Sequence, residues 1–133
     1  MVLPAPMEWE IAVHADGRFV EIVTRGFADS EGSLDMAKAI AATMRCNHMT
    51  NVLVDHRNIE GISGGVVEVY QRPGLFRVIG VILGIRVAEV VKPEHREHFR
   101  FLETVCVNRG YRFAIFHDRA AALEWLLGEC TKE

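Results

Sequence analysis

The first part of the chain alternates apolar and polar residues. Two such runs, at 9–13 and 19–26, are separated by Asp16 and Gly17. Period-two alternation is typical of a half-buried strand, and Asp-Gly between two strands favours a tight hairpin turn. We therefore expect the domain to open with a β-hairpin of two antiparallel strands.

The rest of the chain alternates short apolar runs with segments of helical periodicity. Three runs rich in β-branched or aromatic residues predict strands: 52–54, 86–91 and 113–116. Apolar residues three or four positions apart predict four helices: 30–47, 66–83, 94–108 and 118–127. The second is broken near Pro73 into two pieces, 66–70 and 75–83. Successive strand and helix units imply parallel strands. The expected fold class is α/β, with a mixed five-stranded sheet packed by about four helices.

The predicted helices have recognisable end signals. Asp29 or Ser30 can cap the first helix, and Asp118 can cap the last, because short oxygen-bearing side chains accept hydrogen bonds from the free N–H groups of a first turn. Gly110 is a natural stop for the helix predicted at 94–108.

Length and composition are those of one globular domain. The chain has 133 residues, of which 50% are hydrophobic and 25% are charged, enough to bury a core without disulfide or metal staples. No repeat or linker divides it. We expect a single domain over 1–133, with 1–8 as a flexible N-terminal segment.

Charge and cysteine content limit which partners, which metal or disulfide chemistry and which cellular compartment we expect. The net charge of -3 gives no general attraction to nucleic acid. Cys46, Cys106 and Cys130 are odd in number and widely spaced, which predicts neither a disulfide framework nor a zinc site. The N-terminus does not have the pattern of a signal peptide, and the longest apolar run, 78–85, is far shorter than the roughly 20 residues of a membrane span. We expect a cytoplasmic protein without a membrane span.

Two late segments carry a resemblance to a known family. They are 86–88, which reads Arg-Val-Ala, and 116–118, which reads Phe-His-Asp and precedes Ala-Leu-Glu-Trp-Leu at 122–126. With the order of predicted elements from about Trp9 to Leu127, they make the chain resemble the SpoIIAA-like family of STAS-related domains. The resemblance implies a bacterial protein with a STAS or CRAL-TRIO type of α/β fold, for which regulatory protein binding or lipophilic ligand binding is the usual suggestion.

The resemblance also implies a phosphorylation or anion-binding site. In STAS domains of the anti-sigma-factor-antagonist kind, a Ser-Gly pair opens the helix after a central strand, and the serine is phosphorylated. Ser63, Gly64 and Gly65 occupy the corresponding loop, although Ile62 replaces the usual acidic or serine residue before the pair. A helix N-terminus favours an anion. The alternative is that Ser63 is only a helix cap.

Polar residues also follow two of the predicted strands. Asp55, His56 and Arg57 come where the strand at 52–54 ends, and His117 follows the last strand. Open α/β sheets place ligands outside the carboxyl ends of their strands, so these residues form a candidate sheet-edge site. A histidine oriented by a carboxylate can exchange protons. Asp55 can equally bind loop N–H groups.

A second polar cluster opens the helix predicted at 94–108. Glu94, His95, Glu97 and His98 include two histidines three positions apart, but this spacing alone lacks the further ligands that a metal needs. A solvated first turn whose acids complement the helix dipole explains the cluster better. We expect no metal and no cofactor, and the common nucleotide-binding and hydrolase motifs are absent.

The segment 75–83 is apolar almost all round. Its apolar residues are Leu75, Phe76, Val78, Ile79, Val81, Ile82 and Leu83. A helix of this kind must be covered on more than one side, by the core, by a second subunit or by a lipophilic ligand.

These observations give three hypotheses. The preferred one is a non-catalytic regulatory or protein-interaction module that forms a homodimer through 75–83. The alternative is a CRAL-TRIO-like carrier of a lipophilic small molecule, with 75–83 as a movable lid. The third is an enzyme that uses Asp55, His56 and His117.

Overall fold

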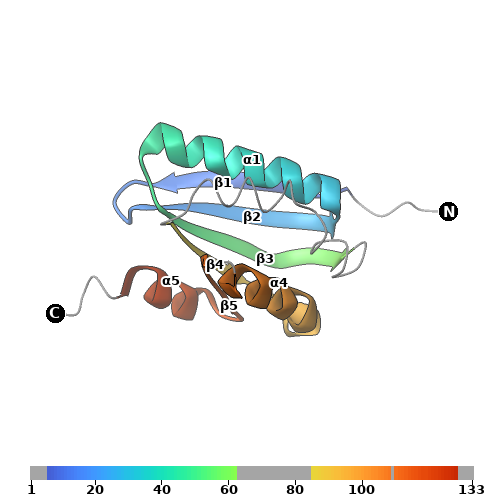
Figure 1. The fold of residues 1–133 in the computed structure, drawn as a ribbon. Helices are drawn as coiled ribbons and strands as arrows, with labels where there is room; N and C mark the ends of the chain where they lie inside the picture. The colour runs from blue at the N-terminus through green and yellow to red at the C-terminus, as the bar shows by residue number, and fades with distance from the viewer. Residues whose placement is uncertain (1–5, 63–84, 109, 129–133) are drawn as a thin grey trace.

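The computed structural model describes residues 6–62, 85–108 and 110–128, and over these residues it contains one five-stranded sheet (Figure 1). The strands follow the sequence order across the sheet: β1 (Glu8–His14), β2 (Phe19–Ala28), β3 (Asn51–Ile62), β4 (Arg86–Val90) and β5 (Arg112–Phe116). β1 and β2 are antiparallel and are joined by residues 15–18, whereas β2, β3, β4 and β5 run parallel. The sheet is therefore mixed.

Three α-helices lie within the described residues, where the sequence predicts about four helices along the whole chain. They are α1 (Ser30–Asn47), α4 (Arg96–Asn108) and α5 (Arg119–Leu127). A short 3-10 turn, η1 (Pro93–His95), precedes α4, so the α-helix begins two residues later than predicted. The helical pieces predicted at 66–70 and 75–83 lie outside the described residues. None of the described helices is long and apolar enough to cross a membrane.

The helices cover both faces of the sheet. Val52, Val87 and Phe113 form one row across β3, β4 and β5; Val52 packs in the cluster under α1, and Phe113 packs against Val105 and Cys106 of α4. We call this side the α1 face. On the opposite side, the α5 face, the core consists of Phe19, Leu53, Ala88, Val90, Ala122 and Leu126. Strand β3 is thus central to two cores.

The predicted helix ends agree with the structure. The Asp29 carboxylate caps α1 by accepting from the N–H of Gly32 at 2.6 Å. The Asp118 carboxylate caps α5 by accepting from two N–H groups of its first turn. Gly110 follows α4 with a φ of 88°, a left-handed conformation that glycine adopts without steric cost. Local side-chain chemistry therefore sets these boundaries.

The extent of β3 was predicted wrongly. The sequence predicts a strand at 52–54 that ends at Asp55, but β3 continues to Ile62. The reason is that β2 offers ten residues for pairing and that Ile59 is completely buried against the rest of the domain. Two register shifts, each inserting one extra residue into β3, keep the two strands paired to their ends.

The core on the α5 face can be tested at Leu126, whose side chain is 1% exposed. Leu126→Ala is expected to lower the free energy of unfolding by about 2–5 kcal/mol, because it removes buried methyl groups and leaves a cavity. Urea denaturation followed by circular dichroism measures this change. Val107→Ala on α4, where the side chain is 52% exposed, is the matched control and should stay within about 0.5 kcal/mol of the parent. Equal effects at both positions would contradict the packing described for α5.

Candidate functional site

β3 carries three of the predicted sheet-edge residues, Asp55, His56 and Arg57, from the level where β4 ends onward. Asp55 lies beside Val90, the last residue of β4, and Val90 lies beside Phe116, the last residue of β5. His117 follows Phe116 directly. Asp55 and His117 are therefore at the same level of the sheet, while β3 itself extends seven residues farther along β2, to Ile62. Asp55, His56 and Arg57 therefore lie within a strand and not after its end, whereas His117 follows the end of β5 as predicted.

The sheet separates Asp55 from His56. Adjacent residues of a strand point to opposite faces. The Asp55 carboxylate lies on the α5 face with Arg57, whereas the His56 ring lies on the α1 face and stacks on Phe99 of α4 at a centroid distance of 4.8 Å. A site that uses both side chains together, as the sequence analysis envisaged, is not what this geometry provides.

Asp55 is held by Arg57, two residues further along the same strand. Its Oδ1 accepts from the backbone N–H and from Nε of Arg57, both at 3.0 Å, and its Oδ2 accepts from Nη2 at 2.9 Å. Burial by itself would raise the pKa of Asp55, but the hydrogen bonds and positive charge of Arg57 outweigh it and hold the pKa below its usual value. Asp55 is accordingly a fixed anion and a weak base.

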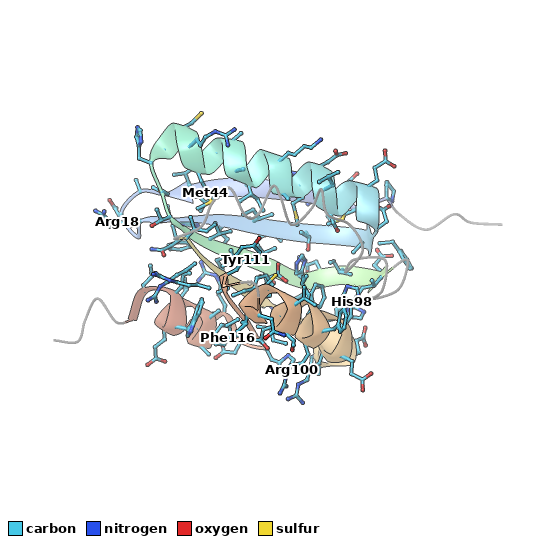
Figure 2. All side chains as sticks on the ribbon, in the orientation of Figure 1. Arg18, Met44, His98, Arg100, Tyr111 and Phe116 are labelled. Carbon is cyan, nitrogen blue, oxygen red and sulfur yellow. The ribbon has the colours of Figure 1, made fainter. Side chains whose placement is uncertain are left out.

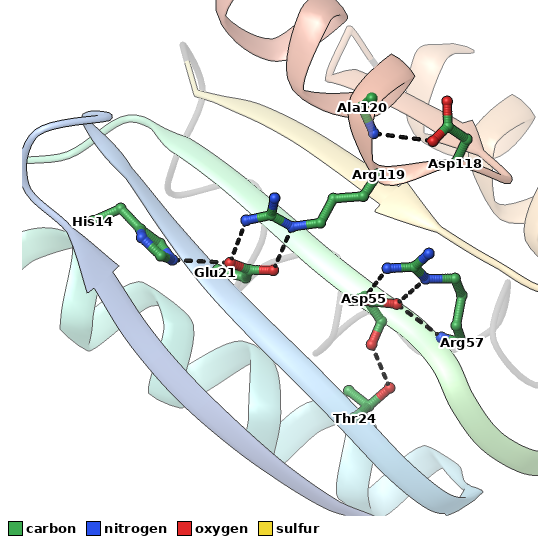
Figure 3. A network of polar contacts seen from close by, with 8 residues as sticks. All are labelled: His14, Glu21, Thr24, Asp55, Arg57, Asp118, Arg119 and Ala120. Atoms are coloured by element: carbon green, nitrogen blue, oxygen red, sulfur yellow. Dashed lines mark hydrogen bonds and ion pairs between the residues drawn. The ribbon is translucent and has the colours of Figure 1, made fainter.

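A second fork of the same kind joins β2 to α5 (Figure 3). Arg119 donates from Nε to Oε2 of Glu21 at 3.0 Å and from Nη2 to Oε1 at 2.9 Å. His14 of β1 donates to the same Oε1 at 2.8 Å and stacks on Phe19. The Arg119 hydrogen bonds lower the pKa of Glu21 below its ordinary value. Sequence reasoning missed this pair, because Glu21 and Arg119 are 98 positions apart and nothing local links them.

These two forks form one ion-pair array: Glu21, Asp55, Arg57 and Arg119. Their fields overlap, since Asp55 helps to raise the pKa of Arg119, and Asp118 and Glu21 help to raise that of Arg57. The carboxylate side chains are 12% exposed, whereas the guanidinium side chains are 43% and 40% exposed. The array therefore presents two arginines to solvent, each hydrogen-bonded to a more buried carboxylate.

The α1 face holds a buried polar cluster instead. Thr24 is completely buried and donates from Oγ1 to the carbonyl oxygen of Asp55 at 3.2 Å. Nδ1 of His56 lies 2.8 Å from the same Oγ1, and Nε2 of His56 lies 3.5 Å from Oε1 of Glu89 in β4. His56 and Glu89 are 4% and 6% exposed. A histidine and a glutamate thus meet inside the core.

The two histidines at the start of α4 lie near this cluster. Figure 2 shows His98 and Arg100 on α4, where His98 is half-buried and Arg100 is exposed. Burial lowers the pKa of His98, and His56 and His95 lower it further, while the charge of Glu89 opposes them. Over the part of the chain that the structure describes, no group of three or more histidine, cysteine, aspartate or glutamate side chains is placed to hold a metal ion.

The other predicted site residues stay apart from these groups. Nδ1 of His117 lies 2.8 Å from the carbonyl oxygen of Val91, and His117 is exposed. Within the described ranges, no hydrogen bond joins His117 to Asp55, His56 or Arg57. The remaining predicted residues lie outside the described residues: Ser63, Gly64, Gly65, Leu75, Phe76, Ile79, Ile82 and Leu83.

Comparison with known proteins identifies the fold. Neither a family model nor a curated protein sequence matches the chain. Among solved structures, an uncharacterized DUF3478-family protein from Shewanella loihica PV-4, described as having a SpoIIAA-like fold, is 20% identical, with a TM-score of 0.54 over 95% of this chain and 97% of its own. The anti-sigma factor antagonist SpoIIAA in its unphosphorylated form is 14% identical, with a TM-score of 0.55 over 91% and 99%. An anti-sigma factor antagonist from Mycobacterium paratuberculosis is 8% identical, with a TM-score of 0.59 over 95% and 98%.

The fold is SpoIIAA-like. The matches span nearly the whole of each chain, which confirms the fold that the sequence resemblance implied. At these identities the likeness concerns the fold alone. It places the ion-pair array and the buried polar cluster on the two faces of a SpoIIAA-like sheet.

The Glu21–Arg119 fork can be tested by acid titration. Arg119→Gln should raise the pKa of Glu21 towards its ordinary value of 4.5, because the charged hydrogen-bond donor is gone. A carboxyl group whose pKa is lower in the folded than in the unfolded protein stabilises the fold at pH values above its unfolded-state pKa. This stability is lost as pH falls through the folded-state pKa. The variant should therefore lose less stability than the parent on acidification. Carboxyl NMR measures the Glu21 titration. Arg25→Gln, which breaks only the exposed ion pairs between β2 and β1, is the control and should leave that titration unchanged.

The lowered pKa of His98 predicts a second pH dependence of the free energy of unfolding. Because its pKa in the folded protein lies below the ordinary 6.5, the unfolded chain binds the proton more readily. The free energy of unfolding should therefore fall as pH drops below about 6.5 and level off below the folded-state pKa. His98→Gln should flatten this part of the profile, measured by urea denaturation at a series of pH values. A parent profile that rises on acidification in this range would contradict the burial of His98.

Proposed function

We propose that this protein is a non-catalytic regulatory or protein-interaction module that acts as a homodimer. Two structural neighbours that share its SpoIIAA-like fold are anti-sigma factor antagonists, which supports a regulatory role. The observation that carries the proposal is the ion-pair array on the α5 face. Its two arginine side chains face solvent and are held in place by carboxylates before any partner binds.

Binding a partner restricts the side chains at the interface, and this restriction costs free energy. A free arginine loses much side-chain freedom when a partner immobilises it, and this loss weakens binding. Arg57 and Arg119 are already held by two-point hydrogen bonds to carboxylates beneath them, yet both remain about two-fifths exposed. Arginine is enriched at protein interfaces and among the residues that dominate binding energy. Two anchored arginines on one face are well suited to contact a protein partner.

The same geometry gives little support to acid–base catalysis. A general base needs a pKa near the working pH and a proton within hydrogen-bond reach. The pKa of Asp55 is lowered by Arg57, and His56 is buried on the opposite face. His117 follows β5, and its Nδ1 contacts the carbonyl oxygen of Val91 and neither of these side chains. The three residues of the enzyme hypothesis therefore do not act on one reacting group in this arrangement.

Dimerisation is proposed from the sequence of 75–83, which lies outside the described residues. Ile79→Asp places a charge at the centre of this apolar run and should convert the dimer to a monomer, because burying an unpaired charge is strongly unfavourable. Native mass spectrometry of the freshly purified chain measures subunit number and retained ligand together. Val107→Asp is the matched control: it adds the same charge at an exposed apolar side chain of α4 and should leave the dimer intact.

Two outcomes would overturn the proposal. A monomeric parent that carries a lipophilic adduct would favour the carrier hypothesis. Turnover of a small molecule by the purified parent that is lost in His117→Ala, with the fold retained, would favour the enzyme hypothesis. If Val107→Asp dissociates the dimer and Ile79→Asp does not, the interface lies on α4 and not on 75–83.

A further inference from the structure

The buried polar cluster on the α1 face contains an arrangement that hydrogen-bond counting can resolve. Thr24 has one hydroxyl proton, and the Asp55 carbonyl oxygen, 3.2 Å away, can only accept. A hydroxyl that donates to that carbonyl has no second proton for Nδ1 of His56, which lies 2.8 Å from the same hydroxyl oxygen. In this orientation of the Thr24 hydroxyl, Nδ1 carries a hydrogen and donates to it.

The other ring nitrogen faces a carboxyl group. Nε2 of His56 lies 3.5 Å from Oε1 of Glu89, and both side chains are more than nine-tenths buried. Oε1 of Glu89 is buried and has no hydrogen-bond partner among the described residues. If neither group carried a further proton, a nitrogen lone pair would face an ionised carboxylate in the core. Burying an unpaired charge against a lone pair in this way is strongly unfavourable.

We propose that His56 and Glu89 form a buried proton-binding site, in which the pair holds one shared proton between Nε2 and Oε1. The pair is then either imidazolium with carboxylate or neutral imidazole with carboxylic acid, and both states have no net charge. The site connects the sheet to α4, because Phe99 stacks on the His56 ring.

The groups around this site on every described element are consistent with a single proton. From β2 comes Thr24, which does not titrate. From η1 and α4 come His95 and His98, and burial keeps the pKa of His98 low, so that it adds no charge near neutral pH. Asp55 is adjacent to His56 in sequence, but its carboxylate is on the opposite face and is neutralised by Arg57. Glu89 is thus the acidic group that faces the His56 ring.

The first test needs no variant. NMR of the full chain near neutral pH, with long-range ¹H–¹⁵N spectra of the His56 ring and the ¹³C shift of the Glu89 carboxyl, counts the protons on the pair. The expected result is a hydrogen on Nδ1 and one further proton, either on Nε2 with Glu89 ionised or on Glu89 with Nε2 bare. A bare Nδ1, or a singly protonated ring beside an ionised Glu89, would overturn the proposal.

The second test uses proton linkage. An unfolded chain above neutral pH holds a neutral imidazole and an ionised carboxylate, so folding takes up the shared proton. The unfolding equilibrium constant should then rise with pH by up to about tenfold per pH unit. Glu89→Gln offers an amide N–H to Nε2 in place of the proton and should flatten this rise.

The comparison requires two controls. Glu97→Gln removes an exposed carboxylate of α4 and should leave the profile parallel to that of the parent. Because His98 also senses Glu89, each variant is measured again in a His98→Gln background. Parallel profiles for the parent and Glu89→Gln in that background would refute the shared proton, and if Glu89→Gln fails to fold, the NMR count on the parent decides the question.

Discussion

The constraint on which this structure depends is that β3 must be buried on both of its faces. Val52, Leu53 and Val54 are all at most 2% exposed, and they divide between the core under α1 and α4 and the core under α5. A strand in this position can turn its successive side chains only to alternate faces. Any polar residue that follows the apolar run is therefore assigned to one of two separate environments. This is why Asp55 and His56, adjacent in the chain, take part in different networks.

Strand β3 also has to remain paired with β2 beyond the ends of β4 and β5. β3 has 12 residues against 10 in β2, and the two register shifts absorb the difference. The first shift falls beside Asp55 and Arg57, where an irregular strand can bring the arginine back over the carboxylate. The second falls near Gly61, where a Cβ atom would lie 2.5 Å from the ring of Phe27, so a glycine leaves room for that ring. The irregularities of β3 thus shape the ion-pair array as well as the sheet.

The sequence contained the fold class and the positions of most elements, because these depend on local periodicity and on helix caps. Asp29, Asp118 and Gly110 terminate their helices through contacts within a few residues, which a sequence displays directly. The length of β3 was not predictable in this way, since residues 55–62 are mostly polar and contain glycine, and their strand conformation comes from pairing with β2. The candidate site could be only partly predicted from the sequence, for the same reason. The pairing of Glu21 with Arg119 and the meeting of His56 with Glu89 depend on sheet register, and no spacing in the sequence encodes it.

The two polar networks share one residue, and this gives the sheet an internal connection. The side chain of Asp55 is bound by Arg57 on the α5 face, while its backbone carbonyl accepts the hydroxyl proton of Thr24 on the α1 face. The same hydroxyl oxygen lies 2.8 Å from Nδ1 of His56, whose Nε2 lies 3.5 Å from Oε1 of Glu89. The buried pair and the exposed array are therefore linked through one peptide group of β3, across a sheet that otherwise keeps its two faces apart.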